Sequence, residues 1–299
     1  MNLKSKRRSF NLLISAILYG TVCLVLSGCT GLFFFPSQQD FPYLADEKVV
    51  HERLQLTSAD GTRLAAMRLP PPAKPIGVAL QFHGNAQNMT SHYRFLSWLP
   101  EMGWEVLTFD YRGYGKSDGK IGRYRSDLEG FVDDGVTALK WANDRALELG
   151  VPLVIFGQSL GGNLALRALT ANKTSAGQLR LLVIDSSFYS FTSIAREKLA
   201  EMWLTWPFQW VSYVLVSDHL SAGPKLETFD PKSLPAAVFL HSETDPVVSN
   251  HQGVLLHNSY PGEKVRWTVS DPGHMNAMSD LNLRKKLIER LRTLHLHAN

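Results

Sequence analysis

Short runs of apolar residues alternate along the chain with segments of helical spacing. The apolar runs are nearly continuous and bounded by turn residues, at positions 76–82, 106–109, 153–156, 181–184 and 236–240, with a weaker run at 265–269. Helical spacing is clearest over residues 128–149 and 283–294. Because strands buried on both faces read as continuous apolar runs, this pattern predicts an α/β fold, with a mostly parallel sheet covered by helices on both faces.

Two segments near the start of this pattern alternate between polar and apolar residues. They span residues 48–56 and 63–69 and are separated by a turn sequence, Ala59-Asp60-Gly61. Alternation on both sides of such a turn is typical of a β-hairpin. A proline-rich stretch at 70–75 then predicts a loop.

One insertion departs from this rhythm. Residues 188–230 separate two predicted strands and carry Trp203, Trp206, Phe208, Trp210 and Tyr213. One interpretation is that these aromatic residues pack in the core beneath one or two longer helices. The other is a small helical cap whose aromatic lining accepts an acyl chain or another apolar group.

The first 28 residues have the pattern of a secretory signal peptide. A basic start is followed by an apolar run at 10–26 and then by Leu26-Ser27-Gly28-Cys29, which looks like a bacterial lipobox. The sequence therefore predicts cleavage before Cys29, lipid on that cysteine, and a tether over residues 29–46 that either packs on the domain or lies at the lipid surface. Since the apolar run approaches the ~20 residues that span a bilayer, an uncleaved anchor is the alternative.

These features also set the expected compartment and partners. Thr30 follows the cysteine in place of the aspartate of an inner-membrane retention signal, so we expect a lipid-anchored protein of the outer membrane that faces the periplasm. The net charge of +4 equals the four Lys and Arg residues of the leader, which leaves a neutral mature chain without the basic face typical of nucleic-acid binding. The only cysteines are Cys23 and Cys29, so residues 47–299, the predicted folded domain, cannot form a disulfide, a cysteine-based zinc site or a cysteine nucleophile.

The strongest candidate for chemistry is the sequence Gly157-Gln158-Ser159-Leu160-Gly161-Gly162. It lies between an apolar strand and a helical segment, the context in which G-x-S-x-G forms a nucleophile elbow. Gly157 and Gly161 would remove side chains that clash with the sharp turn, and Gly162 would let the helix approach the sheet. We therefore expect Ser159 to be a nucleophile.

A serine nucleophile needs a general base. His274 follows the last predicted strand in Asp271-Pro272-Gly273-His274, at the sheet edge where α/β folds bind ligands. His241 lies inside a strand end, and His251 and His257 fall on the following helix. Position therefore favours His274.

The base in turn needs an orienting acid, which follows the serine and precedes the histidine in this type of fold. Asp245 comes just past the strand at 236–240 and meets this order. Asp185, at the end of the strand at 181–184, and Glu243 are the competitors. We expect Asp245 to orient His274.

The oxyanion of an acyl intermediate needs backbone donors. The first is expected to be the N–H of Leu160, and the second to come from Phe82-His83-Gly84-Asn85-Ala86, with Asn85 N–H preferred and Ala86 N–H the alternative. His83 is expected to brace this loop. The sequence Asp110-Tyr111-Arg112-Gly113-Tyr114-Gly115-Lys116-Ser117 ends like a P-loop, but Asp110 stands where that motif needs glycine, so a structural turn is the better interpretation.

Together these segments resemble the α/β-hydrolase superfamily. His83-Gly84-Asn85-Ala86 and the elbow sequence are most similar to the branch that holds monoacylglycerol lipases, serine aminopeptidases and protein depalmitoylases. The resemblance implies an eight-stranded, mostly parallel sheet and an acyl-enzyme mechanism. His83-Gly84-Asn85 also resembles haloalkane dehalogenases, but those enzymes use aspartate where this chain has Ser159.

The expected function is therefore hydrolysis of carboxylic ester or thioester bonds in small acyl or lipid-like substrates, with no metal or cofactor. A serine peptidase would need an acidic anchor for a substrate amine, and Glu197, Glu201 and Glu227 of the insertion are available without a pattern that selects one. A non-catalytic envelope scaffold and an acyltransferase are further alternatives. The acyl chain length and the oligomeric state do not follow from the sequence.

Overall fold

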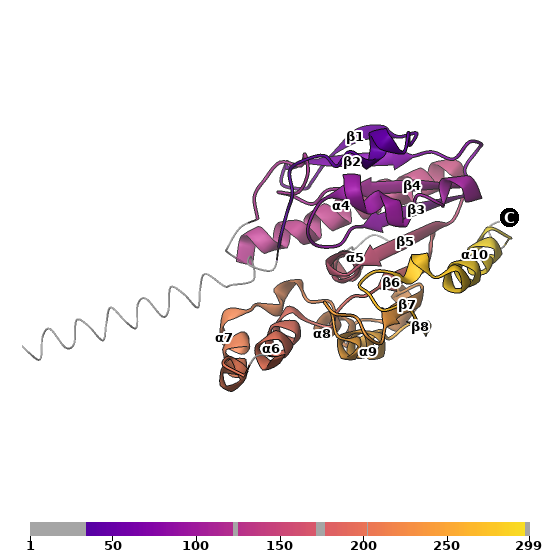
Figure 1. Ribbon diagram of the computed structural model, residues 1–299. Helices are drawn as coiled ribbons and strands as arrows, with labels where there is room; N and C mark the ends of the chain where they lie inside the picture. Colours follow the sequence, from indigo (N-terminus) through magenta and orange to yellow (C-terminus); the bar gives the residue numbers. More distant parts are fainter. Residues whose placement is uncertain (1–33, 122–124, 172–176, 202, 297–299) are drawn as a thin grey trace, which may run out of the picture.

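A single eight-stranded sheet forms the centre of the molecule (Figure 1). The computed structural model describes residues 34–121, 125–171, 177–201 and 203–296. Within these residues the strands are β1 Glu52–Thr57, β2 Arg63–Leu69, β3 Gly77–Phe82, β4 Trp104–Phe109, β5 Leu153–Gln158, β6 Leu179–Asp185, β7 Ala236–Ser242 and β8 Lys264–Val269. Their order is β1-β2-β4-β3-β5-β6-β7-β8. The predicted α/β fold is confirmed.

The pairing of the strands divides the sheet into two parts. From β4 to β8 every neighbouring pair is parallel. At the other edge β1 pairs antiparallel with β2, and β2 pairs antiparallel with β4. The predicted hairpin is thus confirmed, with Thr57 opposite Arg63, although its first strand begins at Glu52.

Helices cover both faces of the sheet. Their bounds are α2 Tyr43–Asp46, α3 Met89–His92, α4 Arg125–Leu149, α5 Leu160–Ala171, α6 Phe191–Glu201, α7 Ser212–Leu215, α8 Gly223–Leu226, α9 Asn250–Ser259 and α10 Leu281–Leu296. One core contains Phe131 of α4 and Leu164 of α5, and the other contains Met89 of α3 and Leu287 of α10. Across the described part of the chain, no helix combines the length and apolarity needed to cross a bilayer.

Residues 34–41 run along the surface of the domain and are called the N-terminal arm below. Phe34 is buried and stacks on Phe131 of α4, with ring centroids 4.8 Å apart, and on Phe191 of α6 at 6.0 Å. Pro36 forms a β-bridge with Gln87. Of the two possibilities for the predicted tether, the described part therefore packs on the domain. The predicted signal peptide and Cys29 lie outside the described residues.

The insertion between β6 and β7 forms a group of short helices that lies at the far side of the molecule from the β1–β2 hairpin (Figure 1). It comprises α6, the 3-10 helix η4 at Trp206–Val211, α7 and α8. Its five aromatic side chains from Trp203 to Tyr213 are between 53% and 87% exposed. The core-packing interpretation is therefore wrong, because these side chains are exposed, and of the five only Tyr213 lines a cavity within the described residues.

Candidate active site

Ser159 occupies a sharp turn between β5 and α5. Its φ of 51° is a left-handed conformation that costs a non-glycine residue energy and is typical of a functional turn. Its N–H donates to the carbonyl of Asp185 at 2.8 Å, and its carbonyl accepts from the Ser187 hydroxyl at 2.8 Å. The end of β6 therefore holds the strained residue in place.

Gly161 brings the elbow against the loop that follows β3. A Cβ at Gly161 would overlap the carbonyl oxygens of Phe82 and His83, so this close approach requires glycine. Since Leu160 is the first residue of α5, its N–H has no acceptor one turn earlier in the helix. The first turn of α5 and the loop after β3 thus meet beside Ser159.

Asp245 and His274 are joined by a hydrogen bond. The distance between His274 Nδ1 and Asp245 Oδ2 is 2.8 Å, and the Asp245 side chain is buried. Burial alone would raise the pKa of Asp245, but hydrogen bonds from His274 and from the N–H groups of Val248 and Val247 hold it below its usual value. Asp245 is therefore an ionised acceptor that fixes which ring nitrogen of His274 carries a proton.

The end of β6 also holds the histidine loop. The N–H of Met275 donates to the Ser186 hydroxyl at 3.0 Å, one residue beyond the carbonyl of Asp185 that accepts from Ser159. Serine and histidine therefore attach to adjacent residues of one strand end. Among the described contacts no hydrogen bond joins Ser159 to His274, in keeping with catalytic hydrogen bonds that tighten when substrate binds.

The three histidines that compete with His274 as the general base have partners away from Ser159. His241 is buried, its Nε2 lies 2.9 Å from the carbonyl of Val248, and it is 3.7 Å from Asp245. Burial lowers the pKa of His241, which keeps it neutral. His251 lies 3.0 Å from Glu197 and His257 lies 3.1 Å from Asn258.

Asp185, the competing acid, is the last residue of β6 and lies near His274 and Asp245. It is buried, and its Oδ1 accepts from the Ser186 hydroxyl at 3.1 Å. Burial raises its pKa to about 7, an effect that the nearby His274 only partly offsets. His274 Nδ1 donates to Asp245 and not to Asp185, and Glu243 is exposed.

The side chain of Asn85 organises the predicted oxyanion loop. Its Oδ1 accepts from the N–H of Ala86 and the N–H of Phe35, both at 2.9 Å, and from the Tyr114 hydroxyl at 2.8 Å. The N–H of Ala86, the alternative of the two predicted donors, thus already has an acceptor. Tyr114 lies in the segment 110–117, which the sequence predicts to be a structural turn. Through the hydroxyl of Tyr114, this turn supports the loop that carries Asn85.

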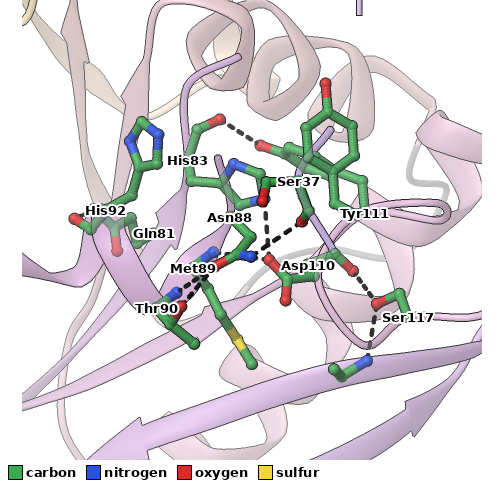
Figure 2. Close-up of polar contacts among 12 residues, drawn as sticks. Ser37, Gln81, His83, Asn88, Met89, Thr90, His92, Asp110, Tyr111 and Ser117 are labelled. Atoms are coloured by element: carbon green, nitrogen blue, oxygen red, sulfur yellow. Dashed lines mark hydrogen bonds and ion pairs between the residues drawn. The ribbon is translucent and has the colours of Figure 1, made fainter. Parts of the chain in front are cut away.

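The N-terminal arm also contacts this loop, through Ser37 and Asn88 (Figure 2). Asn88 Nδ2 donates to the carbonyls of Ser37 and Gln39, at 3.0 and 2.7 Å, while Asn88 Oδ1 accepts from the N–H of Thr90 and caps α3. The N–H of Ser37 donates to the carbonyl of Gln87 at 3.1 Å. Since Ala86 and Gln87 both have positive φ, the arm supports a strained segment.

A buried polar pair lies beneath the loop. His83 Nε2 is 3.5 Å from Asp110 Oδ1, and both side chains are almost fully buried. Burial lowers the pKa of His83 to about 3 and raises the pKa of Asp110 to about 7. In both residues, burial therefore disfavours the charged form of the side chain. The carboxyl group of Asp110 fills the space where a Cβ at Gly115 would lie, so this close approach requires glycine.

The three glutamates of the insertion are all engaged. Glu197 accepts from Ser249, His251 and Gln252, which ties α6 to α9. Glu201 pairs with Lys198, and Glu227 accepts from the Tyr189 hydroxyl at 2.7 Å. A cavity of about 550 Å³ lies between α6 and α9, and its lining residues include Glu197 but none of Ser159, Asp245 and His274.

No cluster of three or more potential metal ligands occurs within the described ranges. Sequence reasoning missed three supporting residues: Ser186, Asn88 and Tyr114. Ser186 has a signal that could have been used, because it follows a buried strand at the same sheet edge as the other site residues. Asn88 and Tyr114 carry no such signal, since their roles depend on contacts with distant segments.

Comparison with known proteins agrees with this architecture. Residues 73–231 match a family model described as serine aminopeptidase, S33. The uncharacterised protein YfhR of Salmonella typhimurium is 30% identical over 93% of this chain and 92% of its own length. A lysophosphatidylserine lipase of Gallus gallus is 29% identical over 71% of this chain and 55% of its own length.

Two solved structures with this fold are esterases with low sequence identity to this chain. A Pyrococcus furiosus esterase covers 87% of this chain and 99% of its own, with a TM-score of 0.64 and 17% identity. An acetyl xylan esterase from Paenibacillus covers 86% and 97%, with a TM-score of 0.61 and 16% identity. At this level of identity the likeness establishes the fold.

Proposed function

Since the chain belongs to the serine aminopeptidase S33 family of α/β-hydrolases, we propose that it is a serine hydrolase that cleaves carboxylic ester or thioester bonds of acyl substrates through an acyl-enzyme intermediate. The observation that carries the proposal is that the end of β6 holds both the strained Ser159 turn and the loop that contains His274. His274 is in turn hydrogen-bonded to Asp245. That combination supplies a nucleophile, a base and an orienting acid.

The acylation step follows from this arrangement. Ser159 Oγ attacks the carbonyl carbon while His274 Nε2 takes its proton, and Asp245 stabilises the imidazolium that forms. The carbonyl oxygen becomes an oxyanion, which the N–H groups of Leu160 and Asn85 bind. Collapse of this intermediate breaks the bond to the alcohol or thiol, which leaves with the proton from His274.

Deacylation repeats the sequence with water. His274 takes a proton from the attacking water, a second oxyanion forms in the same place, and its collapse returns the proton to Ser159 Oγ and releases the acid. These steps need no metal and no cofactor. Because the Nδ1–H of His274 donates a hydrogen bond to Asp245, the proton stays on Nδ1 and Nε2 is available for the proton transfers.

Esters are favoured over peptides as substrates because the insertion offers no unengaged carboxylate for a substrate amine. Glu197, Glu201 and Glu227 each have a partner. The names of the similar proteins, which include a lipase and several esterases, support the same choice.

The proposed location is the outer membrane, with the domain held in the periplasm by lipid on Cys29. The support is the sequence pattern of residues 1–30, and the test is globomycin treatment of producing cells. A larger precursor that accumulates with the drug would support cleavage and lipidation at Cys29. An unchanged size would favour the uncleaved anchor.

The catalytic proposal is tested with a fluorophosphonate probe and with p-nitrophenyl esters from acetate to palmitate. We expect labelling and turnover in the wild type, loss of both in Ser159→Ala, and no change in Ser97→Ala, which alters a half-buried serine whose hydroxyl donates to the carbonyl of Arg94. Folded protein without labelling would contradict the proposal and favour a scaffold. Labelling with turnover of aminoacyl p-nitroanilides in place of esters would favour a peptidase.

A further inference from the structure

Seven large apolar side chains lie exposed along one segment of the insertion. They are Trp203, Leu204, Trp206, Phe208, Trp210, Tyr213 and Val214, and their exposed fractions run from 42% to 87%. We call them the aromatic surface. They come from η4, α7 and the residues just before η4. The stretch 203–217 that contains them has no Asp, Glu, Lys or Arg.

Such a surface on a water-soluble domain marks an interaction site, because monomeric proteins rarely expose so many contiguous apolar groups. Its composition indicates which kind of partner. Trp and Tyr are enriched where a bilayer meets water, since their rings enter the apolar layer while N–H and O–H groups reach the headgroups. Protein interfaces also use arginine heavily, and this stretch has none.

The course of the chain places the same part of the molecule near a membrane. Phe34, the first described residue, stacks on Phe191 at the start of α6. The other end of α6 leads into the aromatic surface, and Arg196 of α6 donates to the Tyr213 hydroxyl at 2.8 Å. The N-terminal arm thus begins beside the helix that supports the aromatic surface.

The predicted attachment is close to Phe34 along the chain. Phe34 lies five positions after Cys29 and eight positions after Leu26, where the apolar run ends. At ~3.5 Å per extended residue, Phe34 can be at most about 18 Å from a lipid on Cys29, or about 28 Å from the end of an uncleaved anchor. With either form of attachment, a bilayer lies within reach of the insertion.

We propose that the aromatic surface inserts into the interfacial layer of a lipid bilayer and holds the domain with its insertion facing the membrane. Interfacial segments carry Trp, Phe and Leu on the face that they bury at the headgroup boundary. The proposal rests on exposure, composition and chain reach, and it holds whether or not Ser159 is a nucleophile.

Tryptophan fluorescence provides the test. The full chain, purified from membranes in detergent, is reconstituted into vesicles of phosphatidylethanolamine and phosphatidylglycerol, with and without phosphatidylcholine brominated on its acyl chains. Three of the seven tryptophans lie in the aromatic surface, and residues 1–33 contain none. Bromine is therefore expected to reduce the emission by a fraction approaching three sevenths, with no signal from the N-terminal attachment itself.

Matched variants identify the source of that signal. The combined variant Trp203→Ser, Trp206→Ser and Trp210→Ser should lose the quenching while keeping its circular dichroism spectrum. The control variant Leu147→Ser with Leu281→Ser, which alters apolar residues 51% and 66% exposed on α4 and α10, should keep it. Ser159→Ala should be quenched like the wild type, which separates this proposal from the catalytic one.

Two results would overturn the proposal. One is wild-type emission that does not respond to bromine, and the other is quenching that persists in the tryptophan variant. If quenching is absent and the tryptophan variant also lowers the mass of a self-associated form in light scattering, the surface contacts a second copy of the chain and not lipid.

Discussion

Replacement of Phe34 by alanine tests whether the N-terminal arm is a working part of the hydrolase domain. The ring of Phe34 is 6% exposed and stacks between Phe131 and Phe191. Its removal leaves a cavity where α4 and α6 meet the arm. Because the arm holds the loop that carries Asn85, we expect the substitution to affect both stability and catalysis.

The expected magnitude follows from the contacts. Truncation of a buried phenylalanine to alanine costs ~3–5 kcal/mol. Phe34 lies near the end of the described chain, where the arm can shift inward, and the arm keeps its hydrogen bonds to Asn85, Asn88 and Gln87. We therefore expect a loss of about 3 kcal/mol, near the lower limit of that range.

Urea unfolding followed by circular dichroism measures the loss, and the neighbouring residue provides the control. Phe35 is 63% exposed, and its contact with Asn85 is made by its backbone N–H, which alanine retains. Phe35→Ala should change the free energy of unfolding by less than about 0.5 kcal/mol. Hydrogen exchange of residues 85–92 should accelerate in Phe34→Ala and not in Phe35→Ala, with a matching fall in esterase kcat.

Equal stability of the two variants would refute the reasoning, because it would mean that the burial of Phe34 contributes nothing to folding. A Phe34→Ala variant that is destabilised but shows unchanged hydrogen exchange in residues 85–92 would refute the expected effect on the loop that carries Asn85. In that case the arm would stabilise the core without supporting the oxyanion loop.

Three further predictions concern the site itself. Asp245→Asn should lower kcat by several orders of magnitude because the wrong histidine tautomer is stabilised, whereas Asp185→Asn should not, as steady-state ester hydrolysis with circular dichroism will check. Burial raises the pKa of Asp110 from 3.8 to about 7, so the contribution of protonated Asp110 to the free energy of unfolding is complete below about pH 4 and is lost as the pH rises toward 7. Asp110→Asn removes this titration, so the free energy of unfolding of the variant relative to wild type should increase between those limits by at most ~1.4 kcal/mol per pH unit, and a constant difference in urea titrations would contradict it. Gly161→Ala should abolish activity or folding because its Cβ overlaps the carbonyl of Phe82, while Gly177→Ala, where the space is open, should melt and react like the wild type.

The strands could be predicted from the sequence because a central parallel strand is buried on both faces. All six residues of β3, β4 and β5 are buried, which is why continuous apolar runs marked them. Strand ends were less exact, since Gln158 and Ser242 extend their strands into polar residues. The hydrogen bond between Asp245 and His274 was also anticipated, because the polar residues after parallel strands meet at one edge.

Two features could not be predicted because they depend on distant contacts. The aromatic stretch after α6 reads as core by composition, but burial depends on what packs above it, and nothing in the described part of the chain covers Trp203 or Trp206. The arm has no periodicity, and its place is fixed by Asn85 and Asn88, which lie about 50 residues further along. Local pattern carries no information about either.

The docked arm also has a consequence for the order of folding. The segment around Phe34 leaves the ribosome before the rest of the domain, yet its stacking partner Phe191 lies in the second half of the chain. Contacts so far apart in sequence form late, after the loop between them has closed. The contact of Phe34 with α6 must therefore wait until the sheet as far as β6 and the start of α6 have been synthesised, whereas Phe131 and the residues that bind the arm at 85–88 are made earlier.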